Sequence, residues 1–237
     1  MDIPHISASS LKTWDTCPLQ FYADKVLKTP RTEPHDLTKV GSAVHLAFER
    51  SKDSGGTSEA LPEACEESGV VSDDYINMAD ELTKTCNDWG WWDGIEDLDL
   101  CEPEQEFLID LGDGVKVKGF IDRLDIKGNT ATILDIKTQA RKFTVDQLRE
   151  NLQADIYNLA ARKLFPQIQG PIRVEFWVLR HEIQAVTRTE EDAAKTEAML
   201  RDRGGEILAW PEEKHPPAHI GNHCRWCNYA DECPEWN

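Results

Sequence analysis

Four cysteines near the two ends of this 237-residue chain constrain its fold more than any other feature. Cys17 lies close to the N-terminus, whereas Cys224, Cys227 and Cys233 fall within the last fourteen residues. Four thiolates in this arrangement can hold an iron–sulfur cluster, and the spacing also fits zinc. Either centre would bring the two ends of the chain together. In a zinc site, a nearby histidine could take the place of Cys17: His215, His219 or His223.

The remaining cysteines indicate a reducing environment. Seven cysteines in total are an odd number, which suits metal-bound thiols better than a disulfide framework. We interpret Cys65, Cys86 and Cys101 as small buried residues. The sequence has no run of eighteen apolar residues and no basic-then-apolar signal pattern at its start. We therefore expect a soluble protein of the cytoplasm.

The net charge of −18 argues against nucleic acid as a partner only when it is taken as a whole. Residues 53–106 carry one lysine against seventeen acids, a net charge of −16. Residues 107–188 carry thirteen lysines and arginines against ten acids, a net charge of +3. We interpret the acidic segment as a solvated helical face. DNA therefore stays open as a partner of the mildly basic segment.

Hydrophobic periodicity predicts a mixed α/β fold, with a central sheet flanked by helices. The predicted helices span residues 7–17, 19–26, 38–52, 144–164 and 189–208, with further helix in the acidic segment. The predicted strands span residues 106–111, 115–127, 131–138, 172–180 and 182–188, with glycine turns between the first three.

The chain is expected to form one compact domain with four segments. Residues 1–52 hold the N-terminal helices, with Cys17 and His45. Residues 53–102 form an acidic helical insertion, residues 103–208 form the core, and residues 209–237 form the cysteine-rich tail.

Two carboxylates and a lysine are predicted to meet at one end of the sheet. Alternate residues of a strand share a face, so Asp135 and Lys137 point the same way. If the strands on either side of Gly128-Asn129 pair, Asp122 comes close to Asp135. Such oxygen ligands suit Mg²⁺ or Mn²⁺, which would polarise a phosphodiester and activate water. A surface ion pair is the plain alternative for Asp135 and Lys137.

These residues are part of an ordered series along the chain. It consists of Gly41-x3-His45, Gly119-Phe120-Ile121-Asp122-Arg123-Leu124-Asp125, Leu134-Asp135-Ile136-Lys137-Thr138 and Gln153-x3-Tyr157. The series resembles the RecB-type branch of the PD-(D/E)xK nucleases. The termini, with Leu11-Lys12-x-Trp14-x2-Cys17-Pro18-x2-Phe21 and Cys224-x2-Cys227-x5-Cys233-Pro234, are similar to the iron–sulfur members of that branch. Those members include the AddB nuclease domain, four-cysteine CRISPR-adaptation nucleases and phage-borne relatives.

The resemblance implies a restriction-endonuclease-like fold with its own metal site. His45, Asp122 and Asp135 would bind Mg²⁺ or Mn²⁺, with the carbonyl of Ile136 as a further ligand. Glu106 loosely matches an acidic residue that precedes the core strands in this family.

The resemblance also implies the remaining roles. Lys137 would be the catalytic lysine, and Asp122 and Asp135 would act with it. Gln153 and Tyr157 would orient the lysine or the DNA backbone. A 4Fe-4S cluster would clasp the termini through four cysteines: Cys17, Cys224, Cys227 and Cys233.

The implied activity is that of a Mg²⁺- or Mn²⁺-dependent deoxyribonuclease. We expect an exonuclease on single-stranded or frayed DNA ends, in recombination, repair or replication. The chain has no Walker-A sequence, so any unwinding would come from a helicase or recombination partner. One alternative is a non-catalytic DNA-end-binding adaptor subunit of a helicase or integrase complex. A zinc-binding structural protein is the other.

Overall fold

The computed structural model describes residues 1, 3–30, 33–54, 56–211 and 214–236. The chain forms two compact units that alternate along the sequence. Unit 1 contains Met1–Glu33, Phe107–Gly119 and Ala194–Asn237, and unit 2 contains Pro34–Glu106 and Phe120–Ala193. The predicted four-segment division follows the sequence and stays a prediction.

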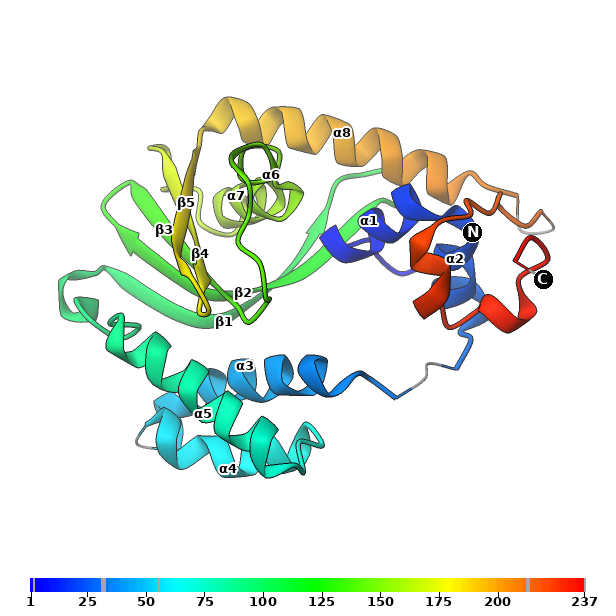
Figure 1. Cartoon of the computed structure of the whole chain (residues 1–237). Coiled ribbons are helices and arrows are strands. Elements are labelled where there is room, and N and C mark those ends of the chain that lie inside the picture. The colour runs from blue at the N-terminus through cyan, green and yellow to red at the C-terminus, as the bar shows by residue number, and fades with distance from the viewer. Residues whose placement is uncertain (2, 31–32, 55, 212–213, 237) are drawn as a thin grey trace. The chain divides into compact units, whose positions relative to one another are not determined.

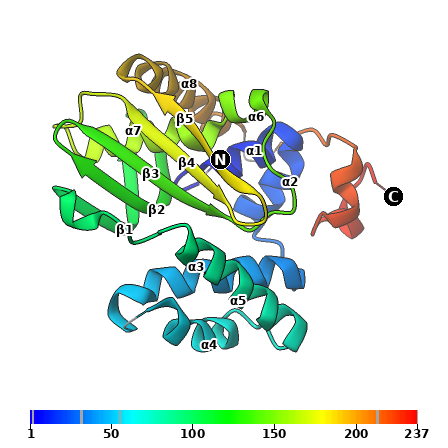
Figure 2. The same ribbon diagram turned by 60° about the vertical axis from the view of Figure 1, so that its left-hand side comes forward.

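The sheet has five strands in the order β1-β2-β3-β4-β5, as Figure 2 shows. The pairs β2–β3 and β4–β5 are antiparallel, whereas β3 and β4 are parallel. A parallel pair needs a crossover, and here it is made by α6 and α7. The predicted mixed sheet is therefore confirmed. The elements named here are β1 (Leu100–Asp110), β2 (Lys116–Lys127), β3 (Thr130–Lys137), β4 (Ile172–Val178), β5 (Glu182–Arg188), α6 (Val145–Arg149) and α7 (Leu152–Leu164).

Three helices of unit 2 cover one face of the sheet, and α7 lies on the other (Figure 1). The three are α3 (Asp36–Ser54), α4 (Thr57–Glu67) and α5 (Asp73–Asp88), and a short 3-10 helix, Ile95–Asp97, follows them. The apolar stripe of α3 packs in one buried cluster with Leu134, Ile136 and Trp177. Acidic side chains of α4 and α5, such as Glu66 and Asp80, are exposed. The acidic segment is thus a solvated helical face, as predicted.

Two predicted boundaries were wrong for identifiable reasons. The helix expected over residues 144–164 is two helices, because Asn151 caps the start of α7 and accepts a hydrogen bond from the N–H of Ala154 (3.0 Å). Strand β1 begins at Leu100, six residues before the predicted start. Its first half contains Pro103, and the sequence therefore did not predict a strand there, because proline cannot donate a hydrogen bond to a neighbouring strand.

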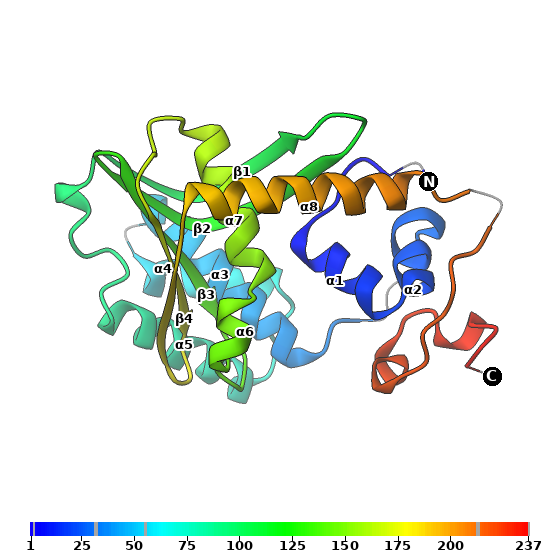
Figure 3. The same cartoon turned by 90° about the horizontal axis from the view of Figure 1, so that it is seen from above.

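Unit 1 brings together segments from both ends of the chain. Helix α1 (Ala8–Thr16) begins with a capping box at Ser7, and α2 (Pro18–Tyr22) continues into a π-helix over Ala23–Leu27. The C-terminal half of α8 (Glu190–Leu208) lies beside α1, where Arg203 pairs with Asp15 (Figure 3). The tail contains two 3-10 helices, Asn222–Trp226 and Ala230–Glu232.

Two backbone contacts also join the ends of the chain in unit 1. The N-terminal amine of Met1 donates to the carbonyl of Leu208 (2.8 Å), and the N–H of Leu19 donates to the carbonyl of Pro217 (3.2 Å). Within the described residues, no helix combines the length and the apolar character needed to cross a lipid bilayer.

Candidate active site

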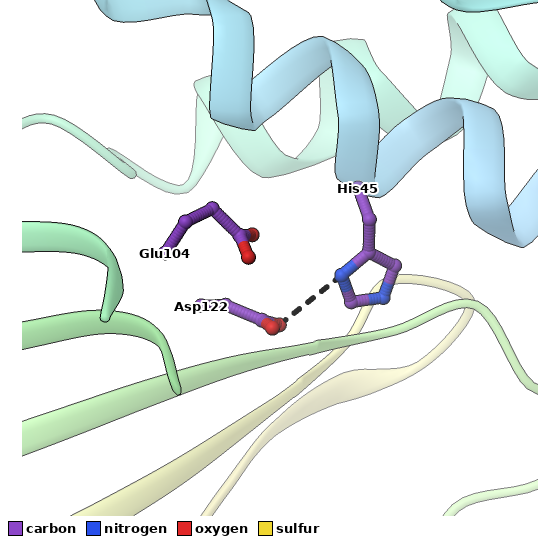
Figure 4. A group of neighbouring side chains, drawn as sticks. All are labelled: His45, Glu104 and Asp122. Atoms are coloured by element: carbon purple, nitrogen blue, oxygen red, sulfur yellow. Dashed lines mark ion pairs between the residues drawn. The ribbon is translucent and has the colours of Figure 1, made fainter. Parts of the chain in front are cut away.

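Three side chains from three elements of unit 2 form a group that could hold a metal ion (Figure 4). His45 comes from α3, Glu104 from β1 and Asp122 from β2. One ligand atom of each lies within 4.8 Å of those of the other two. The Nδ1 atom of His45 is 3.3 Å from Oδ2 of Asp122. An imidazole and two carboxylates are suitable ligands for a divalent cation.

A glycine one helical turn earlier explains how α3 places His45 in this group. A Cβ atom at Gly41 would lie 2.9 Å from Oγ1 of Thr138, the residue that follows β3. Real Cβ atoms essentially never approach other atoms so closely without a shift of one of them. Gly41 therefore lets α3 come near the end of β3, and His45, four residues on, lies on the same side of the helix.

Glu104 was missed by the sequence analysis, which singled out Glu106 instead. Glu106 is exposed, whereas Glu104 is in the metal-binding group. Glu104 has a φ of +48°, a left-handed conformation that costs a residue other than glycine about 1–2 kcal/mol. Such strain is often found where a side chain has a functional position. The preceding Pro103 marks an irregular strand, and it was the one signal in the sequence that could have pointed here.

Asp122 and Asp135 meet where β2 and β3 part, as the sequence predicted. The regular pairing ends with Arg123 opposite Leu134, so Asp122 and Asp135 are the next residue on each strand. The N–H of Ile136 donates to Oδ2 of Asp122 (2.6 Å). The structure thus connects Ile136 to the site through its amide, and its carbonyl as a metal ligand stays a prediction.

Asp135 is fixed by three side chains and is only 1% exposed. Its Oδ1 accepts hydrogen bonds from Nε2 of Gln153 (3.0 Å) and from the hydroxyl of Tyr157 (2.9 Å). Lys137 forms an ion pair with its Oδ2. Gln153 and Tyr157 lie one turn apart on α7, so this helix orients the carboxylate. Their direct partner is therefore Asp135, whereas the sequence had suggested the lysine or DNA.

The charges in this group are strongly coupled. Burial disfavours a charged imidazole, but Asp122 outweighs burial and raises the pKa of His45 to about 9. Burial, together with the repulsion from Asp122, raises the pKa of Glu104 to about 8. Burial also raises the pKa of Asp135, although Lys137 opposes this change. Neighbouring buried carboxylates repel each other when both are charged, and a cation between them offsets that repulsion. The donor set therefore fits a divalent metal.

Arg123, whose role the sequence left open, belongs to the core of unit 2. Its side chain is 2% exposed and donates to both oxygens of Asp125 (2.8 and 2.7 Å). Its guanidinium carbon lies 5.9 Å from the ring centre of Trp91 and 5.5 Å from that of Trp92. The cation–π contacts and the ion pair give Arg123 a structural role.

The four cysteines of the predicted clasp line a single cavity of unit 1. The N–H of His219 donates to Sγ of Cys17 (3.4 Å), and the N–H of Gly221 donates to Sγ of Cys224 (3.4 Å). None of the four is in a disulfide bond. Among the described residues, no three of their sulfur atoms lie within 4.8 Å of one another. Within the part of the chain that the structure describes, the four cysteines therefore share a cavity but form no clasp. The four are Cys17, Cys224, Cys227 and Cys233.

The other three cysteines differ in burial. Cys65 and Cys86 are buried as expected, whereas Cys101 is only partly buried. Burial raises the pKa of all three thiols, most strongly that of Cys86. Such thiols are poor nucleophiles and poor metal ligands.

Comparison with known proteins identifies the family of the chain. Residues 5–234 match the family model of the PD-(D/E)XK nuclease superfamily. The chain belongs to this superfamily. A search of curated proteins finds no match.

One solved structure shares the fold at low sequence identity, and two others match with lower scores. A protein described as a "Putative exonuclease" from Eubacterium rectale is similar with a TM-score of 0.65 and 14% identity, over 94% of this chain and 87% of that one. The protein SSO0001 matches with a TM-score of 0.41 and 15% identity, over 95% of each chain. Protein VC1899 from Vibrio cholerae matches with a TM-score of 0.30 and 12% identity, over 84% of this chain and 54% of that one. The first similarity supports the fold.

Proposed function

We propose that this protein is a metal-dependent DNA nuclease that hydrolyses phosphodiester bonds. The observation that carries the proposal is the group formed by His45, Glu104 and Asp122, with Asp135 and Lys137 beside it. The proposed substrate is a single-stranded or frayed DNA end, which the protein degrades as an exonuclease of the RecB type. Membership of a nuclease superfamily supports a nucleic-acid substrate.

A divalent cation held by His45, Glu104, Asp122 and Asp135, Mg²⁺ or Mn²⁺ in this proposal, would lower the pKa of a bound water and neutralise charge on the phosphate. The role of the remaining side chains follows from their contacts. Lys137 is anchored against Asp135 and can donate to the phosphate oxygens as negative charge develops. Gln153 and Tyr157 donate to Asp135 and so prevent its carboxylate from rotating away.

We also propose that the cysteine cavity of unit 1 holds a 4Fe-4S cluster. Backbone N–H groups already donate to Cys17 and Cys224, and such hydrogen bonds stabilise cluster-bound sulfur. A single zinc ion with Zn–S bonds of about 2.3 Å would draw the sulfurs within about 3.8 Å of one another. An iron–sulfur cluster separates its ligand sulfurs further, and among the described residues no three of these four sulfurs lie within 4.8 Å of one another.

The proposed setting is DNA recombination, repair or replication in the cytoplasm, with a helicase or recombination protein as partner. The resemblance of the sequence to RecB-type nucleases, including phage-borne ones, is the basis of this part of the proposal. The cluster would have a structural role in it.

The test is a cleavage assay on 5′- and 3′-labelled single-stranded DNA with Mg²⁺, Mn²⁺ or EDTA. We expect cleavage only with a metal, and none from the Asp135→Asn variant, which keeps the shape of the side chain. Full activity of that variant, with contaminating nucleases excluded, would overturn the proposal. Metal-dependent DNA binding without cleavage by the unaltered protein would favour the adaptor function instead.

A further inference from the structure

The loop between β3 and α6 begins directly after Lys137 and contains further cations. Residues 136–145 include Lys137, Arg141 and Lys142 and have no acidic residue, although the chain as a whole has a net charge of −18. The carboxylates beside this loop would repel a phosphate. Positive charge on the loop would offset this repulsion in a protein that must hold DNA there.

Two of these three cations already have partners. Lys137 pairs with Asp135, and Nζ of Lys142 lies 2.9 Å from Oε1 of Glu182. Arg141 is exposed, and within the described part of the chain its guanidinium has no hydrogen bond or ion pair. Its charge remains available to a ligand.

The backbone of the loop is held firmly by the β4–β5 hairpin. The N–H of Phe143 donates to Oε1 of Gln184 (2.8 Å), and Nε2 of Gln184 donates to the carbonyl of Phe143 (3.0 Å). Nε2 of His181 lies 2.9 Å from the carbonyl of Ala140. Nε2 of Gln139 donates to the carbonyl of Arg141 itself (2.6 Å). These contacts hold the backbone of the loop, so less backbone entropy would be lost when Arg141 binds a ligand.

The loop and the side chain of Lys137 both lie against the ring of Phe176. The ring centre of Phe143 is 5.0 Å from that of Phe176, and Nζ of Lys137 is 5.7 Å from the centre of the Phe176 ring. Arg141 is the fourth residue after Lys137, so their Cα atoms are at most about 14 Å apart. A DNA strand covers this distance in a few nucleotides.

We infer that Arg141 binds a backbone phosphate of the DNA strand within a few nucleotides of the scissile bond, on a loop positioned by Gln184. The inference rests on the proposed nuclease function. Arginine suits this role because its planar guanidinium donates two parallel hydrogen bonds to a phosphate. The contact would hold the strand without reading its sequence.

The test measures the salt dependence of DNA affinity in the Asp135→Asn background, which cannot cleave. The probe is a 5′-labelled thymidine oligonucleotide, followed by fluorescence anisotropy in Mn²⁺ at several KCl concentrations. We expect Arg141→Gln to lower the slope of log K against log [KCl] by about 0.7, the value for one phosphate contact on a single strand. Arg141→Lys should restore most of the slope.

Arg173→Gln is the matched control. Arg173 is also exposed, but it pairs with Glu175 at the other end of β4 from Val178, and its loss should leave the slope unchanged. An unchanged slope in Arg141→Gln, or equal losses in both variants, would overturn the inference and leave the nuclease proposal intact. If the Asp135→Asn protein binds no DNA and the unaltered protein cleaves none, both proposals fail.

Discussion

The two candidate ligand groups of this protein differ in how far the polypeptide alone assembles them. In unit 2, His45, Glu104 and Asp122 lie within 4.8 Å of one another. Hydrogen bonds from Gln153 and from the N–H of Ile136 fix the adjoining carboxylates. In unit 1 the four cysteines share a cavity, but among the described residues no three of their sulfurs come so close.

The difference indicates that the two sites depend on their metal or cluster in different ways. A carboxylate site held by strand register and buried hydrogen bonds can exist before its metal arrives, and its preorganisation favours catalysis. A cysteine site whose sulfur atoms are not close enough together to bind one ion takes its final shape only with its cofactor, so the cofactor contributes to folding. Variants in the two units should therefore differ in whether they lose the chemistry or the fold.

Asp122→Asn should reduce cleavage at least about 1000-fold at saturating DNA, because it removes a charged ligand and weakens the contact with His45. Unit 2 should stay folded, since the site is assembled by the sheet. Single-turnover rates and far-ultraviolet circular dichroism measure the two effects. Asp146→Asn, at an exposed carboxylate of α6, is the matched control and should be fully active. Equal rates in the two variants would remove Asp122 from the site.

Cys17→Ser should abolish the iron and acid-labile sulfide of anaerobically prepared protein, and it should lower the thermal stability of unit 1. Cys86→Ala should keep both iron and sulfide, because the Cys86 thiol is buried and its pKa is raised. Metal analysis and the brown absorbance provide the measurement. Stoichiometric zinc in a colourless unaltered protein would show that the cluster proposal is wrong.

Asp125→Ala should destabilise the protein by about 3–5 kcal/mol, because it leaves the charge of Arg123 buried without its partner. Urea unfolding measures this change. Lys84→Ala removes an exposed ion pair with Asp88 and should leave the unfolding midpoint where it is. A small effect of Asp125→Ala would mean that the two tryptophan rings alone hold Arg123.

Gly41→Ala should lower the cleavage rate about tenfold, because a new Cβ atom would press on Thr138 and shift His45 away from Asp122. The stability should change little, since alanine favours a helix. Adding Thr138→Ser, which keeps the hydroxyl, should not rescue the rate, whereas Thr138→Ala should. A Gly41→Ala variant with full activity would show that the close approach is dispensable.

Much of this site could be predicted from the sequence because the rules that place it are local. Strand alternation places Asp135 and Lys137 together, and the Gly128-Asn129 turn brings Asp122 to the same end of the sheet. Gln153 and Tyr157 share a helix face because they are four residues apart.

The features that were missed depend on contacts between distant segments. Glu104 reaches the metal group through a left-handed residue after a proline, which no periodic pattern predicts. The burial of Arg123 depends on Trp91 and Trp92, more than thirty residues earlier in the chain. The separation of α6 from α7 depends on a single cap at Asn151, in a sequence that otherwise continues as helix.

If unit 2 carries the chemistry, Lys137→Ala should stop cleavage and leave unit 1 unchanged. The measurement is the single-turnover rate of cleavage of single-stranded DNA in Mn²⁺, together with the iron content of the same preparation. We expect a fall in rate of at least about 100- to 1000-fold with unchanged iron and unchanged DNA affinity. A Lys137→Ala protein that cleaves within a factor of about three of the unaltered protein would contradict it.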